Sequence, residues 1–316
     1  MSAQQLFPFP VARYRLVFQV ERAIRLPEYA GSWLRGIFGA ALRRITCLTG
    51  EPRCDGCMLL RRCPYSILFA APPPPGEHVV QSFANIPNPY VIEPPPWGER
   101  DFPEGAELLF HLVLVGRARL QLALVILAWQ QALARRVGAT EGAARLAAVW
   151  QIQADGSELL VFDSESGNLV EHHPWLEPPI ELPESASCTL HLLTPLRIQQ
   201  QGKPLRGRQL TARDLLIALA RRISLLAEFH ADWHLALPFT ELSRQAEEVT
   251  VSGHLSWRDW TRWSCRQEQE MVLGGVVGHW SLHGDLAPFW DLLYLGQWLH
   301  AGKNATFGLG HYRLQV

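Results

Sequence analysis

Residues 300–312 read HAGKNATFGLGHY, and this stretch near the carboxyl end is the most specific signal in the sequence. Glycine adopts positive φ without steric cost, so the stretch predicts a tight turn whose successive backbone N–H groups form a concave anion site. Lys303 would add a positive charge and Thr306 a hydroxyl group. The spacing differs from a Walker loop, because no Gly-Lys-[Ser/Thr] ends it. An ordinary β-turn is the alternative. The glycines concerned are Gly302, Gly308 and Gly310.

The overall charge excludes a uniformly basic, histone-like protein. The 316 residues carry 29 Lys+Arg against 30 Asp+Glu, and 48% are hydrophobic, which favours a folded protein over a disordered one. Only Lys203 and Lys303 are lysines, so the basic residues are almost all arginine. Arginine pairs phosphate and stacks on bases, although a GC-rich genome produces the same bias. A local basic patch therefore leaves nucleic-acid binding open.

No targeting or membrane signal is visible in the sequence. The longest clean apolar run, over residues 122–129, is far below the roughly 20 residues that span a bilayer. The first ten residues lack a basic segment followed by an apolar one. We therefore expect a cytoplasmic protein without a membrane partner, in which cysteines are thiols or metal ligands.

The hydrophobic pattern predicts the order strand, helix, strand, strand, helix, strand twice, which is the ferredoxin-like order. In the first half we expect a strand over 13–20, a helix from Pro27, an extended segment between the prolines of 72–75 and 94–96, a strand over 107–115, a helix over 117–137 and a hairpin over 143–162. In the second half we expect strands over 187–198, 249–257, 270–282 and 312–314, and helices over 211–230 and 285–300.

These elements predict an α+β protein of two tandem ferredoxin-like (RRM-like) domains with antiparallel sheets. The first domain covers residues 1–170 and carries a four-cysteine insert at 47–63. A linker rich in proline and acidic residues follows at 171–185, and the second domain covers 186–316.

The insert has a metal-ligand pattern. A CxxC pair with a glycine inside it is flanked by one cysteine on each side, and four thiolates within seventeen residues suit a tetrahedral structural Zn²⁺. An iron–sulfur cluster or free thiols are the alternatives. The four residues are Cys47, Cys54, Cys57 and Cys63.

Residues 257–266 read WRDWTRWSCR, in which three tryptophans alternate with three arginines. The arginines are four residues apart, so they share one face of either a strand or a helix. Trp and Arg planes stack on unpaired bases, whereas a tryptophan face buried in the core is the alternative. A second basic segment with Lys203, Arg206 and Arg208 either grips RNA or only solvates a turn.

Four stretches, in this order, resemble the RAMP superfamily, and most closely the CRISPR-associated endoribonucleases that process precursor CRISPR RNA within its repeats. They are LRGIFGAALR at 34–43, LTPLR at 193–197 with the helix around 215–222, WTRWSCRQ at 260–267 with Gly274-Gly275, and the glycine-rich end preceded by His300.

The resemblance implies metal-independent cleavage, in which a 2′-OH attacks the scissile phosphate and leaves a 2′,3′-cyclic phosphate and a 5′-OH. The family often has a histidine near the first helix, whereas the first histidine here is His78. We therefore predict His300 as the base and Lys303 as the phosphate cation, with Tyr29 and Ser32 orienting the 2′-OH and His311 as the alternative base. The predicted RNA contacts are Arg35, Arg206, Arg208, Arg258, Arg262, Arg266, Gly302, Thr306, Gly308 and Gly310.

The resulting hypothesis is an endoribonuclease that converts precursor CRISPR RNA into mature guide RNAs without a catalytic metal, and that works with other CRISPR-associated proteins. A non-catalytic RAMP-type subunit that binds guide RNA is the first alternative. The second is a zinc-dependent DNA or protein adaptor that contacts its partner through the cysteine insert.

Overall fold

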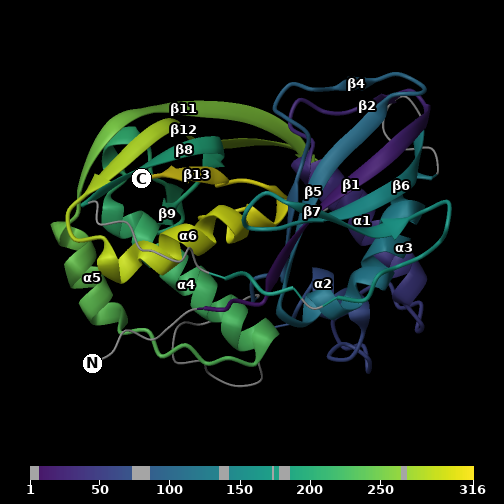
Figure 1. Cartoon of the computed structure of the whole chain (residues 1–316), viewed down its shortest axis with the longest axis horizontal. Helices are drawn as coiled ribbons and strands as arrows, with labels where there is room; N and C mark the ends of the chain where they lie inside the picture. Colours follow the sequence, from purple (N-terminus) through teal and green to yellow (C-terminus); the bar gives the residue numbers. More distant parts are fainter. Residues whose placement is uncertain (1–6, 73–85, 135–141, 173, 178–185, 265–268) are drawn as a thin grey trace. The chain divides into compact units, whose positions relative to one another are not determined.

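The computed structural model describes residues 7–72, 86–134, 142–172, 174–177, 186–264 and 269–316 (Figure 1). The chain divides into two compact units. The first unit is Val11–Pro174 together with Phe229–Asp232. The second unit is Met1–Pro10, Trp175–Glu228 and Trp233–Val316. None of the described helices is long and apolar enough to cross a membrane.

A five-stranded antiparallel sheet forms the first unit, in the order β3-β5-β1-β6-β7. The strands are β1 (Val11–Arg22), β3 (Tyr90–Glu93), β5 (Glu107–Val115), β6 (Ala143–Ile152) and β7 (Glu158–Asp163). In β1 the apolar residues alternate with half-buried polar ones, so Tyr14, Leu16 and Phe18 enter the core as their period-two spacing predicts. A separate short ribbon pairs β2 (Ile24–Arg25) with β4 (Asp101–Phe102).

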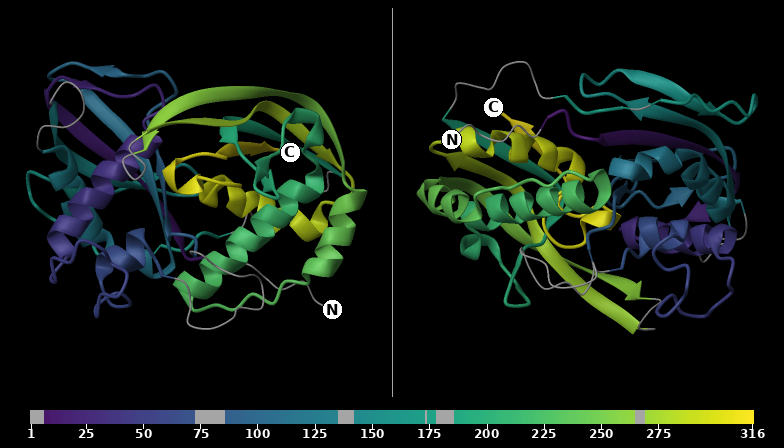
Figure 2. Two further views of the ribbon diagram at one scale, coloured as in Figure 1. Left: turned by 180° about the vertical axis from the view of Figure 1, so that it is seen from behind. Right: turned by 90° about the horizontal axis from the view of Figure 1, so that it is seen from below.

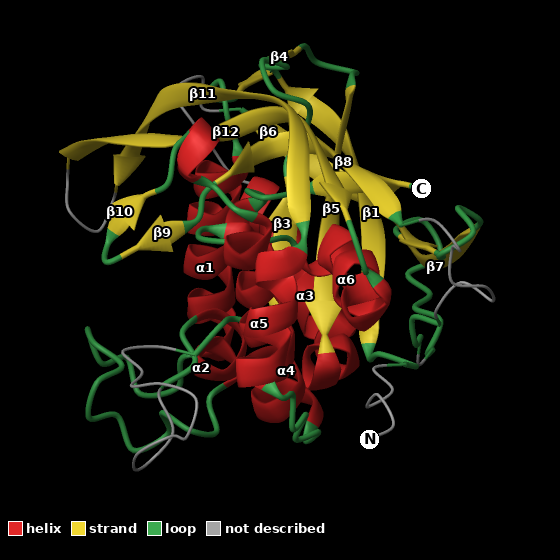
Figure 3. Ribbon diagram, turned by 90° about the vertical axis from the view of Figure 1, so that its left-hand side faces the viewer, coloured by secondary structure: helices red, strands yellow, loops and turns green. Residues whose placement is uncertain are grey.

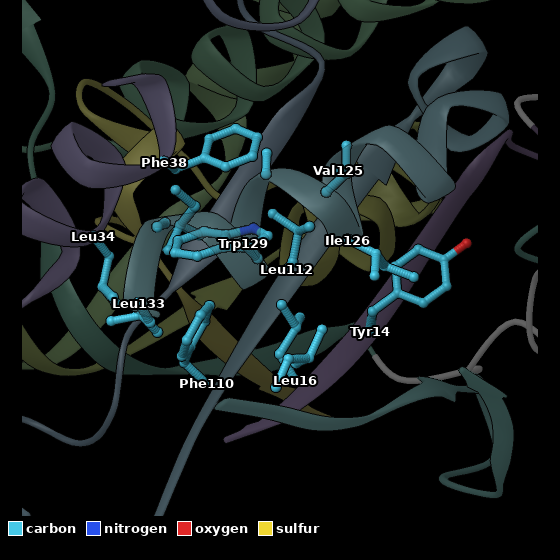
Figure 4. Close-up of a cluster of buried hydrophobic side chains, with 14 of the residues drawn as sticks. Tyr14, Leu16, Leu34, Phe38, Phe110, Leu112, Val125, Ile126, Trp129 and Leu133 are labelled. Carbon is cyan, nitrogen blue, oxygen red and sulfur yellow. The ribbon is translucent and has the colours of Figure 1, made fainter. Parts of the chain in front are cut away.

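The helices of the first unit are α1 (Gly31–Thr46), α2 (Pro64–Phe69) and α3 (Leu122–Leu133), the last preceded by a 3₁₀ turn at Gly116–Gln121. Trp129 lies at the centre of their core, fully buried between Phe38, 4.9 Å away in a stacked geometry, and Phe110 at 4.7 Å (Figure 4). The prediction that the first helix begins at Pro27 is wrong, because residues 27–30 bend and Tyr29 stacks on Trp97 instead.

A four-stranded antiparallel sheet forms the second unit, in the order β11-β12-β8-β13. The strands are β8 (Ser187–Leu196), β11 (Thr250–Ser264), β12 (Gln269–His283) and β13 (Tyr312–Gln315). Helices α4 (Ala212–Ala231) and α6 (Trp290–Leu299) lie along one face of this sheet (Figures 1 and 2). A small hairpin of β9 (Gln199–Gln200) and β10 (Lys203–Pro204) stands apart from it (Figure 3).

Both sheets confirm the predicted ferredoxin-like order. In each unit the chain runs β-α-β-β-α-β, and the last strand lies beside the first, which lies beside the third. The first unit adds β7 as the second arm of the predicted hairpin. The sequence did not predict α5 (Phe239–Glu248), which buries only Leu242 and Ala246.

Short segments of the chain cross from one unit to the other. Phe9 exchanges two backbone hydrogen bonds with Leu176, of 2.9 and 2.8 Å, so the amino-terminal segment belongs to the second unit. Conversely, Arg117 donates to the carboxylate of Asp232 and to the carbonyl of Phe229, each at 3.0 Å, within the first unit. The domain limits expected from the sequence, 1–170 and 186–316, remain a prediction.

A partly buried histidine gives the first unit a pH-dependent stability. The His111 side chain in β5 is 31% exposed, and its Nδ1 lies 4.0 Å from Glu93 Oε2, which also accepts a 2.8 Å hydrogen bond from Arg13. Burial lowers the pKa of His111 to about 4; the charges of Arg13 and Arg15 add to this, whereas Glu93 and Glu158 oppose it. His111 is therefore neutral in the folded protein at neutral pH.

The free energy of unfolding should fall between pH 6.5 and 4, because the unfolded chain takes up a proton at His111 that the folded chain does not. At pH 5 the loss from this group is at most about 2 kcal/mol. Urea unfolding of the wild type and His111→Asn at pH 7.5 and pH 5 measures it, with the exposed His234→Asn as control. An unchanged pH dependence in His111→Asn would contradict the assignment.

Candidate functional site

The glycine-rich end of the second unit forms the predicted turn. Helix α6 ends at Leu299, and His300 follows with a φ of 60°. Positive φ recurs along the segment at Gly302 (78°), Gly308 (95°) and Gly310 (72°). A 3₁₀ turn at Ala305–Phe307 and β13 complete the connection. The glycines therefore provide the backbone conformation that the sequence predicts.

The sequence predicts that successive N–H groups of the turn form an anion site. Several of these N–H groups instead donate hydrogen bonds to acceptors within the protein. The N–H of Lys303 donates to the Arg197 carbonyl at 2.7 Å, and that of Gly310 donates to the Pro195 carbonyl at 3.0 Å. The Thr194 hydroxyl donates to the Gly308 carbonyl at 2.7 Å and accepts from the His311 N–H at 2.9 Å. The LTPLR segment at the end of β8 thus fixes the turn in place.

Two glycines also permit the chain to approach itself closely. A Cβ atom at Gly302 would lie 2.4 Å from the Arg197 carbonyl oxygen, and one at Gly310 would lie 1.9 Å from that of Ala301. Both distances are far below van der Waals contact, so any side chain there displaces backbone. These glycines serve the fold, and their contact with RNA stays a prediction.

The turn stacks two imidazoles on each other. The rings of His300 and His311 are 4.5 Å apart and almost parallel, with an interplanar angle of 9°. His300 is 0% exposed, and its Nδ1 lies 3.3 Å from the Leu309 carbonyl oxygen. His311 is only partly buried. Of the two rings, His311 is the one that a bound molecule can touch without a rearrangement of the turn.

Two cationic residues of the second unit lie in or beside this turn. The Lys303 side chain is exposed, whereas Arg222 on α4 donates from Nε to the carbonyl of Leu299 at 2.8 Å and so caps the end of α6. Burial lowers the pKa of Arg222 to about 10, which leaves it charged at neutral pH. Its Nη2 is buried without a hydrogen-bond partner among the described residues. No sequence signal marks Arg222, because it is one of three arginines on α4 and no spacing distinguishes it from Arg213 and Arg221.

The basic and aromatic segment is a strand, which settles the choice between strand and helix that the sequence leaves open. The guanidinium of Arg206 lies 4.7 Å over the ring of Trp257, whose Nε1 donates to Asp259 at 2.6 Å. Trp260 is buried, whereas Arg258 is exposed, as is Arg208. Arg262 lies in β11, where only its backbone is described, and Arg266 lies outside the described residues.

Arg197 connects this strand pair with the turn. Its Nη1 donates to the carbonyl of Gly274 in β12 at 2.6 Å, while its own carbonyl accepts from Lys303. Thr306 is partly exposed in the same turn. The second unit therefore brings the glycine-rich turn, its two histidines and the LTPLR segment into one connected structure.

The remaining candidates belong to the first unit. Tyr29 is 6% exposed, and burial, with the charge of Glu93 second, raises its pKa well above the usual value, so the phenol is neutral. Arg35 on α1 lies 4.3 Å over the ring of Phe69. The four insert cysteines are all partly exposed and form no disulfide.

The architecture of the two units defines a class of protein. Two βαββαβ units, the second with a glycine-rich turn before its last strand, make up the tandem ferredoxin-like arrangement that the resemblance to the RAMP superfamily implies. Residues 190–312 match the model of the CRISPR-associated endoribonuclease Cas6, and residues 9–174 match the AF_1859_N N-terminal domain model. The match over residues 190–312 confirms the resemblance of this part of the chain to the CRISPR-associated RAMP-type endoribonucleases.

Solved structures agree with this fold. A Cas6 product complex is 16% identical with a TM-score of 0.55, covering 96% of this chain and 99% of its own. Thermus thermophilus Cas6 is 14% identical with a TM-score of 0.52, covering 97% and 98%. The partial Cas6-RT-Cas1–Cas2 complex is 15% identical with a TM-score of 0.54, covering 98% of this chain and 46% of its own. Among curated protein sequences none matches the chain.

Proposed function

We propose that this chain cleaves precursor CRISPR RNA within its repeats, in the cytoplasm, by metal-independent attack of a ribose 2′-OH. The 2′-oxygen bonds to the adjacent phosphorus, the bond from phosphorus to the 5′-oxygen breaks, and the products are a 2′,3′-cyclic phosphate and a 5′-OH. The nucleophile belongs to the RNA, so the protein has to move protons and stabilise negative charge. The stacked His300–His311 pair in the glycine-rich turn is the observation that supports this chemistry most directly.

The two histidines have different roles in this proposal. His311 is the partly exposed ring, so it takes the proton from the 2′-OH. His300 is fully buried and holds His311 by stacking, with its Nδ1 beside the Leu309 carbonyl. The sequence predicts His300 itself as the base, and the cleavage assay described below tests both histidines. Lys303, which is exposed, neutralises the charge that develops on the phosphate.

The RNA contacts remain those predicted from the sequence. Arg206, Arg208 and Arg258 are exposed in the second unit, where guanidinium groups can pair phosphates. The neutral phenol of Tyr29 can donate a hydrogen bond but cannot act as a base at neutral pH. Since a structural relative is named as a Cas6-RT-Cas1–Cas2 complex, we include other CRISPR-associated proteins among the partners.

One observation favours a second candidate function, a non-catalytic subunit that binds guide RNA. The predicted base His300 is 0% exposed, and no histidine occurs in residues 1–77. Such a subunit would bind the repeat RNA and leave it intact.

Incubation of the full-length protein with 5′-labelled repeat RNA in EDTA separates the two functions. We expect two fragments, the upstream one with a cyclic phosphate, and no cleavage of RNA that has a 2′-deoxy nucleotide before the scissile phosphate. His311→Ala should slow single-turnover cleavage roughly 100-fold without loss of RNA affinity, because it removes the proton-transfer group. The matched control is His283→Ala, an exposed histidine of β12.

Each contrary result has a definite meaning. A gel shift without fragments supports the binding subunit. Cleavage that EDTA abolishes and Mg²⁺ restores contradicts the metal-independent step. A wild-type rate in His311→Ala together with a slow His300→Ala returns the role of base to His300.

A further inference from the structure

The cysteine insert connects two helices without a core of its own. Cys47 is the residue that ends α1, and Cys63 is the residue from which α2 begins. No residue from 47 to 63 is buried, and the segment contains no helix or strand. Leu48 and Met58 are 86% and 89% exposed. Apolar burial therefore cannot hold this segment in one conformation, and a cross-link is needed in its place.

The four thiols face a common hollow. Its lining includes all four cysteines together with Arg43, Thr49 and Arg53. The Thr49 hydroxyl lies 3.6 Å from Cys57 Sγ and 4.0 Å from Cys47 Sγ, so one side chain contacts two of the sulfurs. Residues separated by up to sixteen positions thus bring their thiols to one place.

The CxxC pair already has a tight turn between its thiols. The N–H of Cys57 donates to the Cys54 carbonyl at 3.0 Å, and Gly56 has a φ of 82°. Nothing lies within 4 Å of the Cβ position at Gly56, so the glycine is there for its backbone conformation alone. This turn directs two thiols to the same side of the chain.

We propose that Cys47, Cys54, Cys57 and Cys63 together bind one structural Zn²⁺. Tetrahedral Zn–S bonds of about 2.3 Å place the sulfurs about 3.8 Å apart. Among the described residues no three of these sulfurs lie within 4.8 Å of one another, so binding draws the segment inward. Arg43 and Arg53 at the hollow offset the negative charge of four thiolates.

The metal would fix more than its own segment. It joins the end of α1 to the beginning of α2, and α2 carries Phe69. The Phe69 ring occupies the space beside Gly39, where a Cβ would lie 2.3 Å from it, and the Arg35 guanidinium lies 4.3 Å over the same ring. Zinc thereby holds the surroundings of Arg35, one of the predicted RNA contacts.

Elemental analysis of the full-length protein, purified from zinc-supplemented and iron-supplemented medium, tests the proposal. We expect about one zinc per chain in the wild type, and less than about a tenth of that in Cys57→Ser and in Cys54→Ser. The control is Cys188→Ser, since Cys188 is a buried thiol of β8 outside the insert and should leave the zinc content unchanged.

A second measurement needs no variant and so does not depend on whether a serine variant folds. Titration of the wild type with a mercurial reagent, with a dye that reports free zinc, should release zinc as four thiols react. Zinc-free wild type that gains no thermal stability when zinc is added overturns the proposal. So does iron with visible absorbance in place of zinc, or zinc that remains in Cys57→Ser. RNA cleavage enters none of these readouts, so their failure is distinct from failure of the proposed function.

Discussion

Gly310→Ala should lower the free energy of unfolding by roughly 3–5 kcal/mol. Its Cβ would lie 1.9 Å from the carbonyl oxygen of Ala301, and the atoms it meets are backbone rather than a movable side chain. The φ of 72° adds strain of its own. Urea unfolding measures the loss, and RNA cleavage should disappear with it, because His311 follows directly.

Gly202→Ala is the matched control for this variant. Gly202 has a φ of 79° in the same unit, but nothing lies within 4 Å of its Cβ position. Only the conformational cost remains there, about 1 kcal/mol. Equal losses in the two variants would show that close approach at Gly310 contributes nothing.

Trp129→Ala should destabilise the first unit by about 3–5 kcal/mol. The ring is fully buried and contacts Phe38 and Phe110, so its removal leaves a cavity that the surrounding strands cannot fill. Trp129→Phe should cost less, because it keeps an aromatic ring and removes an Nε1–H that has no partner among the described residues.

The control for the buried position is Leu127→Ala, an exposed residue on the same helix as Trp129. Leu127 is 43% exposed, so its truncation should change the melting temperature of the first unit only slightly. A loss in Leu127→Ala as large as that in Trp129→Ala would mean that helix α3 itself, rather than the aromatic cluster, limits stability.

Much of the fold follows from local patterns. The alternation in β1 and the apolar spacing of the helices give the order of elements in both units, and Thr211 with Asp214 marks the start of α4 as expected: the Asp214 N–H donates to the Thr211 hydroxyl at 3.2 Å. Helix α5 escapes prediction because it buries only two residues. The start of α1 depends on the contact of Tyr29 with Trp97, which is distant in sequence.

The site is only partly readable from the sequence. Positive φ at the glycines is a local property, so the turn is predictable. The acceptors of its amides lie on Pro195 and Arg197, more than a hundred positions earlier, and no spacing rule connects them. The stacking of His300 on His311 likewise arises because the turn closes on itself. No local sequence pattern indicates this closure.

The return of Phe229–Asp232 to the first unit has a consequence for biosynthesis. On the ribosome, Val11–Pro174 emerges long before the residues whose carboxylate and carbonyl receive Arg117. The nascent first unit therefore gains the two acceptors of Arg117 only after the end of α4 has left the ribosome.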